Sequence, residues 1–499
     1  DGFKGDGYIK NVEKLELSNT TSIGRSFNAK DVAGLKTVAL NSEKGIEVKN
    51  LANIVDVELT NLKADKFSID AMYANKVLDS ASGVKDTQNL KVNGVGAKDK
   101  AVALTAEKIE VLNLNTIGEA SFLKDVNVEN VSVKGSANLS LTTGLKTTTL
   151  DASSFGGALD ADLSASDKLN TVKGGNGNDK ITIGTNVANV NVDGGAGNDE
   201  LVIKSSTAGT LQPTLTNIEK VTIDGNTADL TLSLKKAESV TELSFANLAK
   251  KVTESNGNVD TVNFLAGNSE ASSAQVTISD ATLKTINFVD ADKAVKGNIA
   301  ADKATELTIN SGKVEAAADA VVTAASATNI SINAAKDTAG LTLTAGKLTD
   351  LTVNNKGDFE LVGGVAGTLN NVENLTVASE GKFSITGSTT LNKVGNIALS
   401  GKEIDLANQN IGSDTLSSLA VEVSELSGDL KLGSTIKAKG DINVNLNSIN
   451  TATLGNITSS TGNASVIISS ATGAVKLGTV SAVNGNVTLN AGDASTSVT

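Results

Sequence analysis

A short aliphatic motif recurs along most of the chain at a nearly constant interval. It has the form h-x-x-h-x-h, where h is an aliphatic or aromatic residue, and the regular copies begin about 22 residues apart. Fixed periods of this size indicate stacked repeats, in which each coil buries its apolar side only against its neighbours. The sequence therefore predicts an all-β fold, a repetitive parallel β-solenoid (β-helix) with few short helices.

The regular copies lie in the C-terminal half. They are Ile218-Val221-Ile223, Val240-Leu243-Phe245, Val259-Val262-Phe264, Leu283-Ile286-Phe288, Ala304-Leu307-Ile309, Ala327-Ile330-Ile332, Leu348-Leu351-Val353, Val372-Leu375-Val377, Val394-Ile397-Leu399 and Leu416-Leu419-Val421. The last positions of each copy alternate as in a half-buried strand. The intervening segments are rich in Asn, Gly, Ser, Thr and Asp, which favour turns.

The N-terminal copies are less evenly spaced. They are Val12-Leu15-Leu17, Leu35-Val38-Leu40, Ile54-Val57-Leu59, Ile109-Leu112-Leu114 and Val128-Val131-Val133. The gap between the third and fourth copies predicts an insertion. Within it, Phe67, Ile69, Met72, Tyr73 and Val77 predict a short amphipathic helix near 62–80. An Ala-rich run at 314–322 is a second helical candidate.

Two near-identical nonapeptides interrupt the pattern in the middle of the chain. They are Gly174-Gly175-Asn176-Gly177-Asn178-Asp179-Lys180-Ile181-Thr182 and Gly194-Gly195-Ala196-Gly197-Asn198-Asp199-Glu200-Leu201-Val202. Both fit G-G-x-G-x-D-x-U-x, with U a large aliphatic residue. This is the calcium-binding repeat of parallel β-rolls.

Calcium chemistry explains these residue types. Glycine permits the positive φ angles of a tight loop, so that backbone carbonyls can turn inward. Ca²⁺ takes six to eight oxygen ligands at roughly 2.3–2.6 Å, and the Asp at position six supplies a carboxylate. One loop provides half a coordination sphere and a second loop, one coil away, provides the rest. The predicted calcium ligands and loop residues are Asp179 and Asp199 with Gly174, Gly175, Gly177, Asn178, Gly194, Gly195, Gly197 and Asn198. An ordinary Asn-Gly turn is the alternative.

The loops depart from a regular β-roll in their spacing. Same-side loops of a β-roll lie about 18 residues apart, whereas Gly174 and Gly194 are separated by 20. Eighteen residues before Gly174 lies a degenerate copy that keeps the paired glycines and shifts the Asp. Asp160 or Asp162 is therefore predicted to serve a second, weaker calcium site.

These patterns divide the chain into four regions. Residues 1–150 form an irregular β-repeat region with the helical insertion, and residues 151–204 form the calcium-binding β-roll segment. Residues 205–445 form the regular solenoid, and residues 446–499 form a C-terminal β region where the motif blurs into Ser/Thr/Gly/Asn-rich strands.

Composition limits the chemistry of this chain. It has no Cys, His or Trp, one Arg (Arg25) and 2% aromatic residues. The usual Ser-His-Asp or Cys-His nucleophile systems are therefore excluded, as is a typical zinc site. Catalytic acids and bases would form a cluster, and the sequence shows no recognisable one. The chain is therefore predicted not to be an enzyme. The net charge of −13 argues against nucleic acid as a partner.

Other features bear on where the protein works. No apolar run is long enough to span a membrane. The absence of Cys fits a bacterial exported protein. Since the chain begins at Asp1 without an initiator Met or a secretory signal, we expect a mature or trimmed fragment.

The two GGxGND loops, the Cys-free acidic composition and repeats such as NVENLTV and NIEKVTI resemble those of bacterial surface-layer (S-layer) proteins. The resemblance is to the calcium-dependent, type I-secreted kind of Campylobacter and Caulobacter, with RTX-type nonapeptides. It implies a secreted structural protein that self-assembles with itself into a two-dimensional lattice on the cell surface. It further implies calcium at the loops around Asp179 and Asp199. Family members bind lipopolysaccharide through a separate N-terminal region, which is not evident in this sequence.

Two other functions remain open. The first is a calcium-dependent secreted adhesin, which would carry a distinct receptor-binding module. The second is a β-helix polysaccharide-degrading enzyme, in which Asp160 and Asp162 could form a carboxylate pair.

Overall fold

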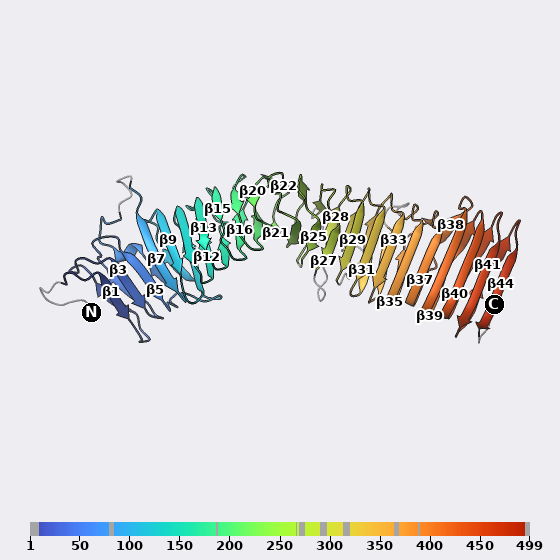
Figure 1. The fold of residues 1–499 in the computed structure, drawn as a ribbon, viewed down its shortest axis with the longest axis horizontal. Helices are drawn as coiled ribbons and strands as arrows, with labels where there is room; N and C mark the ends of the chain where they lie inside the picture. Colours follow the sequence, from blue (N-terminus) through green and yellow to red (C-terminus); the bar gives the residue numbers. More distant parts are fainter. Residues whose placement is uncertain are drawn as a thin grey trace. The chain divides into compact units, whose positions relative to one another are not determined.

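The computed structural model describes residues 9–78, 84–185, 188–265, 267–268, 275–289, 297–312, 320–363, 369–387 and 390–494. These residues are nearly all β-strand, and their strands pair in parallel from one coil to the next (Figure 1). The predicted parallel β-solenoid is confirmed. The chain divides into two compact units, Asp1–Thr241 and Glu242–Thr499. The four regions distinguished in the sequence stay a prediction.

The first unit contains two long parallel sheets that share each coil. One consists of β1 (Lys14–Ser18), β3 (Thr37–Asn41), β5 (Asp56–Thr60), β7 (Thr87–Asn93), β9 (Val111–Thr116), β11 (Asn130–Gly135), β13 (Thr149–Phe155), β15 (Thr171–Lys173), β17 (Asn191–Asp193) and β20 (Thr214–Thr216). The other consists of β6 (Lys66–Ser68), β8 (Val102–Thr105), β10 (Ser121–Val126), β12 (Leu139–Thr143), β14 (Leu159–Asp162), β16 (Lys180–Gly184), β18 (Glu200–Ser205) and β21 (Lys220–Asn226). Two short pairs complete the unit: β2 (Arg25–Asn28) with β4 (Ile46–Lys49), and β19 (Gly209–Leu211) with β22 (Leu230–Ser233).

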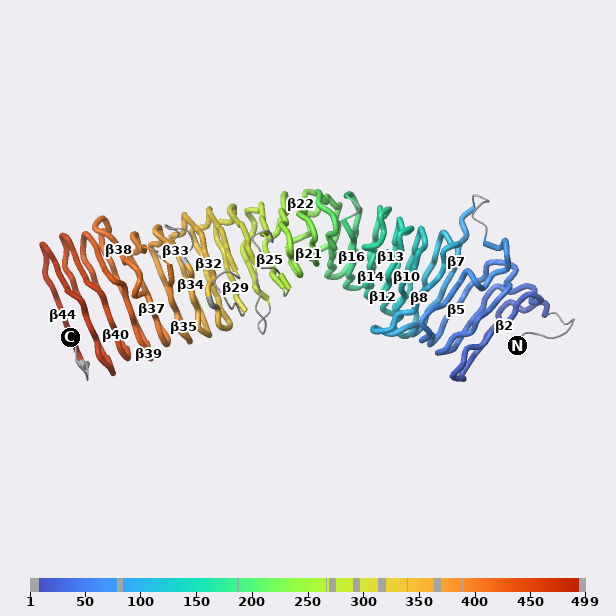
Figure 2. Tube along the Cα trace, turned by 180° about the vertical axis from the view of Figure 1, so that it is seen from behind, coloured from blue at the N-terminus to red at the C-terminus, as the bar shows by residue number. Residues whose placement is uncertain are grey.

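The second unit repeats this arrangement, and Figure 2 shows its successive coils as a tube. Its first sheet consists of β23 (Glu242–Ala246), β25 (Thr261–Phe264), β27 (Thr285–Phe288), β29 (Glu306–Ser311), β31 (Asn329–Ala334), β33 (Asp350–Asn355), β35 (Asn374–Thr386), β37 (Asn396–Leu406), β39 (Ser418–Ala438), β40 (Asp441–Ser459), β41 (Ala464–Ala471) and β44 (Val487–Ala494). Its second begins with β24 (Val252–Ser255), β26 (Gln275–Thr277), β28 (Gly297–Ala300), β30 (Ala320–Thr323), β32 (Thr338–Thr344) and β34 (Phe359–Gly363). The long strands β35, β37, β39 and β40 continue this second sheet beyond register shifts. Shorter strands beside them are β36 (Thr390–Leu391), β38 (Asn410–Ser413), β42 (Val475–Leu477) and β43 (Val480–Ala482).

The core is a column of aliphatic side chains inside each unit. Strand residues alternate between the interior and solvent, because successive side chains of a strand point to opposite faces. In β31, for example, Ile330 and Ile332 are buried while Asn329 is exposed. Larger side chains stack from coil to coil, and the Phe264 ring lies 5.4 Å from the ring of Phe288 and 5.7 Å from that of Phe245.

The strand register differs from the motif alignment at two coils. Ile286 pairs with Ile309, two residues beyond Leu307, which the sequence motif aligned with it. The same difference occurs where Ile397 pairs with Val421. A shift of two residues leaves the same side chains on the core face, so the aliphatic pattern cannot reveal it.

The insertion expected after Leu59 contains a coil that the sequence motif missed. Val57 pairs with Leu90 of β7, and Leu90 in turn pairs with Leu114. The motif failed here because two of its three aliphatic positions are polar: Gln88, which pairs with Leu112 and is fully buried, and Lys85 three residues before it.

The prediction of an amphipathic helix near 62–80 is wrong. The described part of this segment, 62–78, contains the strand β6 and one turn of 3-10 helix, η1 (Asp70–Met72). Phe67 and Ile69 point inward with the two-residue period of a strand. An apolar run this short fits the period of a helix as well as that of a strand, so the sequence pattern could not distinguish them. Of the Ala-rich candidate, 314–319 lies outside the described residues and 320–322 belongs to β30. Within the part of the chain that the structure describes, no helix has the length and apolarity needed to cross a membrane.

Candidate functional site

The two glycine-rich loops stack directly on each other. They connect β15 to β16 and β17 to β18, strands that pair in register one coil apart. A Cβ on Gly174 would lie 2.1 Å from the carbonyl oxygen of Gly194, and a Cβ on Gly177 would lie 2.5 Å from that of Gly157. Close approach of neighbouring coils therefore explains these glycines. Positive φ angles explain others, since Gly195 has φ +93° and Gly197 φ +136°.

The predicted ligands Asp179 and Asp199 point inward and form a ladder with Glu219. Each carboxylate accepts a hydrogen bond from a backbone N–H at the equivalent position of the preceding coil. Asp179 Oδ1 accepts from Leu159 at 2.9 Å, Asp199 Oδ1 from Asp179 at 2.7 Å, and Glu219 Oε2 from Asp199 at 2.8 Å. The structure thus brings the predicted pair together.

The carboxylates of Asp179 and Asp199 differ in their remaining oxygen. Asp179 Oδ2 accepts a second hydrogen bond, from the N–H of Gly175 at 2.6 Å. Asp199 is fully buried, and its Oδ2 has no hydrogen-bond partner among the described residues. Burial raises the pKa of Asp199 to about 6, and the nearby Asp179 and Glu219 carboxylates act in the same direction. Burial also raises the pKa of Asp179.

The unpartnered oxygen of Asp199 fits a hard cation. Leaving a buried charged acceptor unsatisfied is costly, and carboxylate and carbonyl oxygens are the ligands that Ca²⁺ prefers. Among the described residues no group of three or more acidic side chains is close enough to hold a metal ion. An ion here would therefore be held by the Asp199 and Asp179 carboxylates together with backbone carbonyls of the two loops. It would neutralise two buried charges and bind one coil to the next.

The loop asparagines link the coils to each other. Asn178 Oδ1 accepts a hydrogen bond from the backbone N–H of Asn198 at 3.0 Å. Asn178 therefore contributes to loop stacking through its side chain, and Asn198 through its backbone.

Asp160 and Asp162 lie on the outer face of β14, apart from the inward ladder. Asp162 forms an ion pair with Lys204 at 2.9 Å and accepts hydrogen bonds from the N–H and hydroxyl of Ser164. Despite partial burial, these partners hold its pKa below the ordinary value. The structure therefore does not bring this pair to the inward carboxylates of Asp179 and Asp199.

Sequence reasoning missed the half-buried Glu219 and one pair of buried acids. Glu219 follows Asp199 by the same 20 residues that separate Asp199 from Asp179, and that spacing was the available signal. In the second unit, Glu254 and Asp280 are buried together and both accept from the N–H of Gly257, at 3.1 and 3.0 Å. Burial and then the Asp280 charge raise the pKa of Glu254 to about 7. No periodic motif marks this second pair.

The fold and the loops define a class: a parallel β-solenoid with an inward carboxylate ladder at stacked glycine-rich turns. No family model, curated protein or solved structure matches the chain significantly.

Proposed function

We propose that this protein is a structural component of a bacterial surface layer, a calcium-stabilised solenoid that assembles with copies of itself outside the cell. The observation that carries the calcium part of the proposal is the fully buried Asp199 carboxylate, whose Oδ2 lacks a hydrogen-bond partner among the described residues. A bound divalent cation would satisfy this oxygen and offset the repulsion with Asp179.

The solenoid surface supports the assembly part of the proposal. In the second unit, the amides of Asn287, Asn310, Asn333 and Asn354 each donate to the Asn side chain one coil earlier, at 2.8 to 3.1 Å. This asparagine series repeats one polar group at each coil from Asn263 to Asn354. Such a periodic surface suits regular lateral association through hydrogen bonds rather than apolar patches.

Calorimetry and electron microscopy test the two parts separately. Calcium is titrated into EDTA-treated protein, and assembly is then followed by light scattering and imaging with millimolar calcium or EDTA. The test variant is Asp179→Ala/Asp199→Ala. The matched control, Asp414→Ala/Asp429→Ala, removes two exposed carboxylates elsewhere.

We expect saturable calcium binding and ordered sheets with the parent and the control, and neither with the test variant. Calcium binding without sheets would reject the surface-layer function and retain the metal site. A monomer that takes up no calcium would reject both.

A further inference from the structure

The short sheet of β2 and β4 stops where the next coil should continue it. β4 pairs with β2, and β6 of the next coil pairs with β8. The two coils touch on either side of this point. Lys63 N–H donates to Glu43 O, and Leu51 N–H donates to Met72 O, both at 2.9 Å. The backbones of segments 44–50 and 64–71 therefore separate and rejoin.

A groove of about 780 Å³ occupies the separation. Its walls include β2, β4 and β6, with Phe67 and Met72 among the apolar residues that line it. The segment carrying β6 continues into η1, which contacts β4 where the two coils rejoin. This volume is in the range of sites that hold a ligand.

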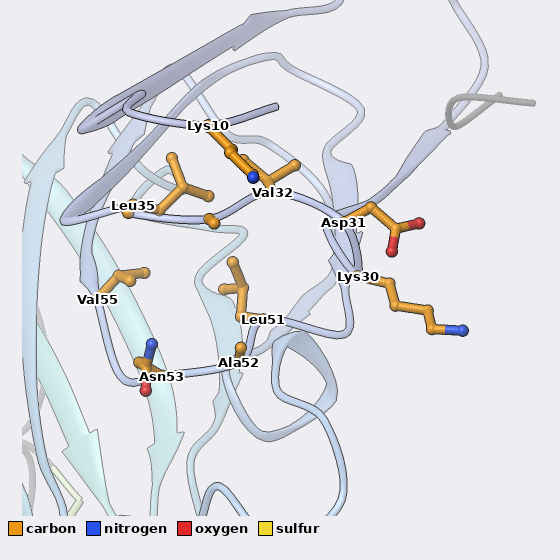
Figure 3. Close-up of a pocket in the computed structure, with 11 residues that line it drawn as sticks. Lys10, Lys30, Asp31, Val32, Leu35, Leu51, Ala52, Asn53 and Val55 are labelled. Carbon is orange, nitrogen blue, oxygen red and sulfur yellow. The ribbon is translucent and has the colours of Figure 1, made fainter. Parts of the chain in front are cut away.

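A smaller pocket of about 300 Å³ lies between the first coils and differs in kind (Figure 3). Val32, Leu35 and Leu51 surround it, whereas Lys30 points away. The backbone N–H groups of Val32 and Leu51 are already hydrogen-bonded. These two backbone groups are therefore not free to pair with an added strand.

The groove exposes two strand edges that face each other. In a parallel pair, successive residues direct their backbone groups to opposite sides of the strand. Lys49 O accepts from Ala29 on the β2 side, so the N–H and C=O groups of Ile46 and Val48 face the groove. Asp65 O and Ile69 N–H bond to the β8 coil, so the corresponding groups of Lys66 and Ser68 face it from the other wall.

Basic side chains surround these edges. Arg25, Lys44 and Lys66 are exposed at the groove, while Glu47 is paired with Lys49 at 2.8 Å. This concentration of positive charge stands out in a chain whose net charge is −13.

We propose that the groove binds an extended acidic peptide segment of a partner protein as an added β-strand. Its backbone would pair with β4 on one side and β6 on the other, which is the β-augmentation mode of peptide recognition. Alternate side chains would enter the interior beside Phe67. The others would point outward, where acidic groups face Arg25 and Lys66.

The test uses the full chain and a fluorescent eight-residue peptide that alternates valine and glutamate. Two control peptides are used. In one, lysine replaces every glutamate; in the other, alternate backbone nitrogens are methylated. Anisotropy measures binding to the parent, to Arg25→Glu/Lys66→Glu and to the control Lys393→Glu, an exposed lysine of the second unit. Hydrogen exchange measures protection of segments 44–50 and 64–72.

We expect the acidic peptide to bind the parent and the control, with protection of both segments, and to bind the charge-reversed variant at least tenfold more weakly. The lysine and N-methylated peptides should not bind. Absence of binding, or binding indifferent to methylation, would overturn the proposal. Self-association lost on charge reversal would also overturn it, because the occupant would then be a second copy of the chain.

Discussion

Asp199 accepts a hydrogen bond from the backbone N–H of Asp179, its equivalent one coil earlier, at 2.7 Å. The two motif carboxylates are therefore consecutive steps of one ladder. The ladder leaves one buried oxygen of Asp199 without a partner among the described residues.

Asp199→Asn should make the calcium-free protein more stable at pH 7, by about 2 kcal/mol, because it removes a buried charge while keeping an acceptor for the Asp179 N–H. In the parent, the pKa of Asp199 is raised to about 6 from an ordinary 3.8. Its stabilising contribution is thus present below pH 3.8 and lost as pH rises through 6.

Urea unfolding in EDTA across this pH window measures both effects of Asp199→Asn. Calcium bound at the proposed site should stabilise the parent but not the variant, since a ligand stabilises only the state that binds it. A variant that is less stable in EDTA at pH 7, or equally stabilised by calcium, would contradict this assignment.

Glu254→Gln should flatten the pH dependence of stability in the second unit. The pKa of Glu254 is raised to about 7 from 4.5, so its stabilising contribution is complete below pH 4.5 and lost as pH rises through 7. Thermal unfolding between pH 4 and 8 measures the effect. The control Glu380→Gln changes an exposed carboxyl and should follow the parent curve; identical curves for both variants would refute the prediction.

Gln88 and Tyr73 should show energetic coupling. The buried Gln88 accepts from the Tyr73 hydroxyl at 2.6 Å and donates to Val55 O at 2.8 Å. Gln88→Leu should lower the free energy of unfolding by about 2 kcal/mol, because it removes a hydrogen-bond partner from the buried Tyr73 hydroxyl and Val55 carbonyl. With Tyr73→Phe in the same chain, the loss should be about 1 kcal/mol smaller than the sum of the single losses. Urea denaturation of the four proteins completes the cycle, and strict additivity would show that the contact carries no energy.

Gly194→Ala should destabilise the loop stack by more than about 2 kcal/mol. The added Cβ would lie 2.0 Å from Asn217 O and 2.5 Å from Asp199 Oδ2. The matched Gly346→Ala meets no atom within 4 Å and should change stability by less than about 0.5 kcal/mol. Equilibrium unfolding compares them, and equal stabilities would mean that the coils can separate at no cost.

Much of the fold follows from local pattern. The aliphatic motif predicted the parallel coils, because a strand places alternate residues on one face and each coil needs a neighbour to cover it. The nonapeptides likewise predicted that Asp179 and Asp199 meet, since equal spacing brings equivalent positions together in a stack. Gln88 shows the limit of this logic. It occupies a core position because distant residues satisfy its hydrogen bonds, but as a polar residue it is not recognised by an aliphatic pattern.

The tertiary structure decided what period alone leaves open. Moving a strand by two residues preserves every inward side chain, so only packing between coils selected the pairing of Ile286 with Ile309. The ladder consists of the acids that accept a hydrogen bond from a backbone N–H one coil away. Glu219 accepts such a bond, whereas Asp162 lies on the outer face and pairs with Lys204. The sequence by itself determined a stack of parallel coils with two acidic glycine-rich turns. The register, the membership of the ladder and the opening between β4 and β6 arise from contacts between residues far apart in the chain, which a local pattern does not encode.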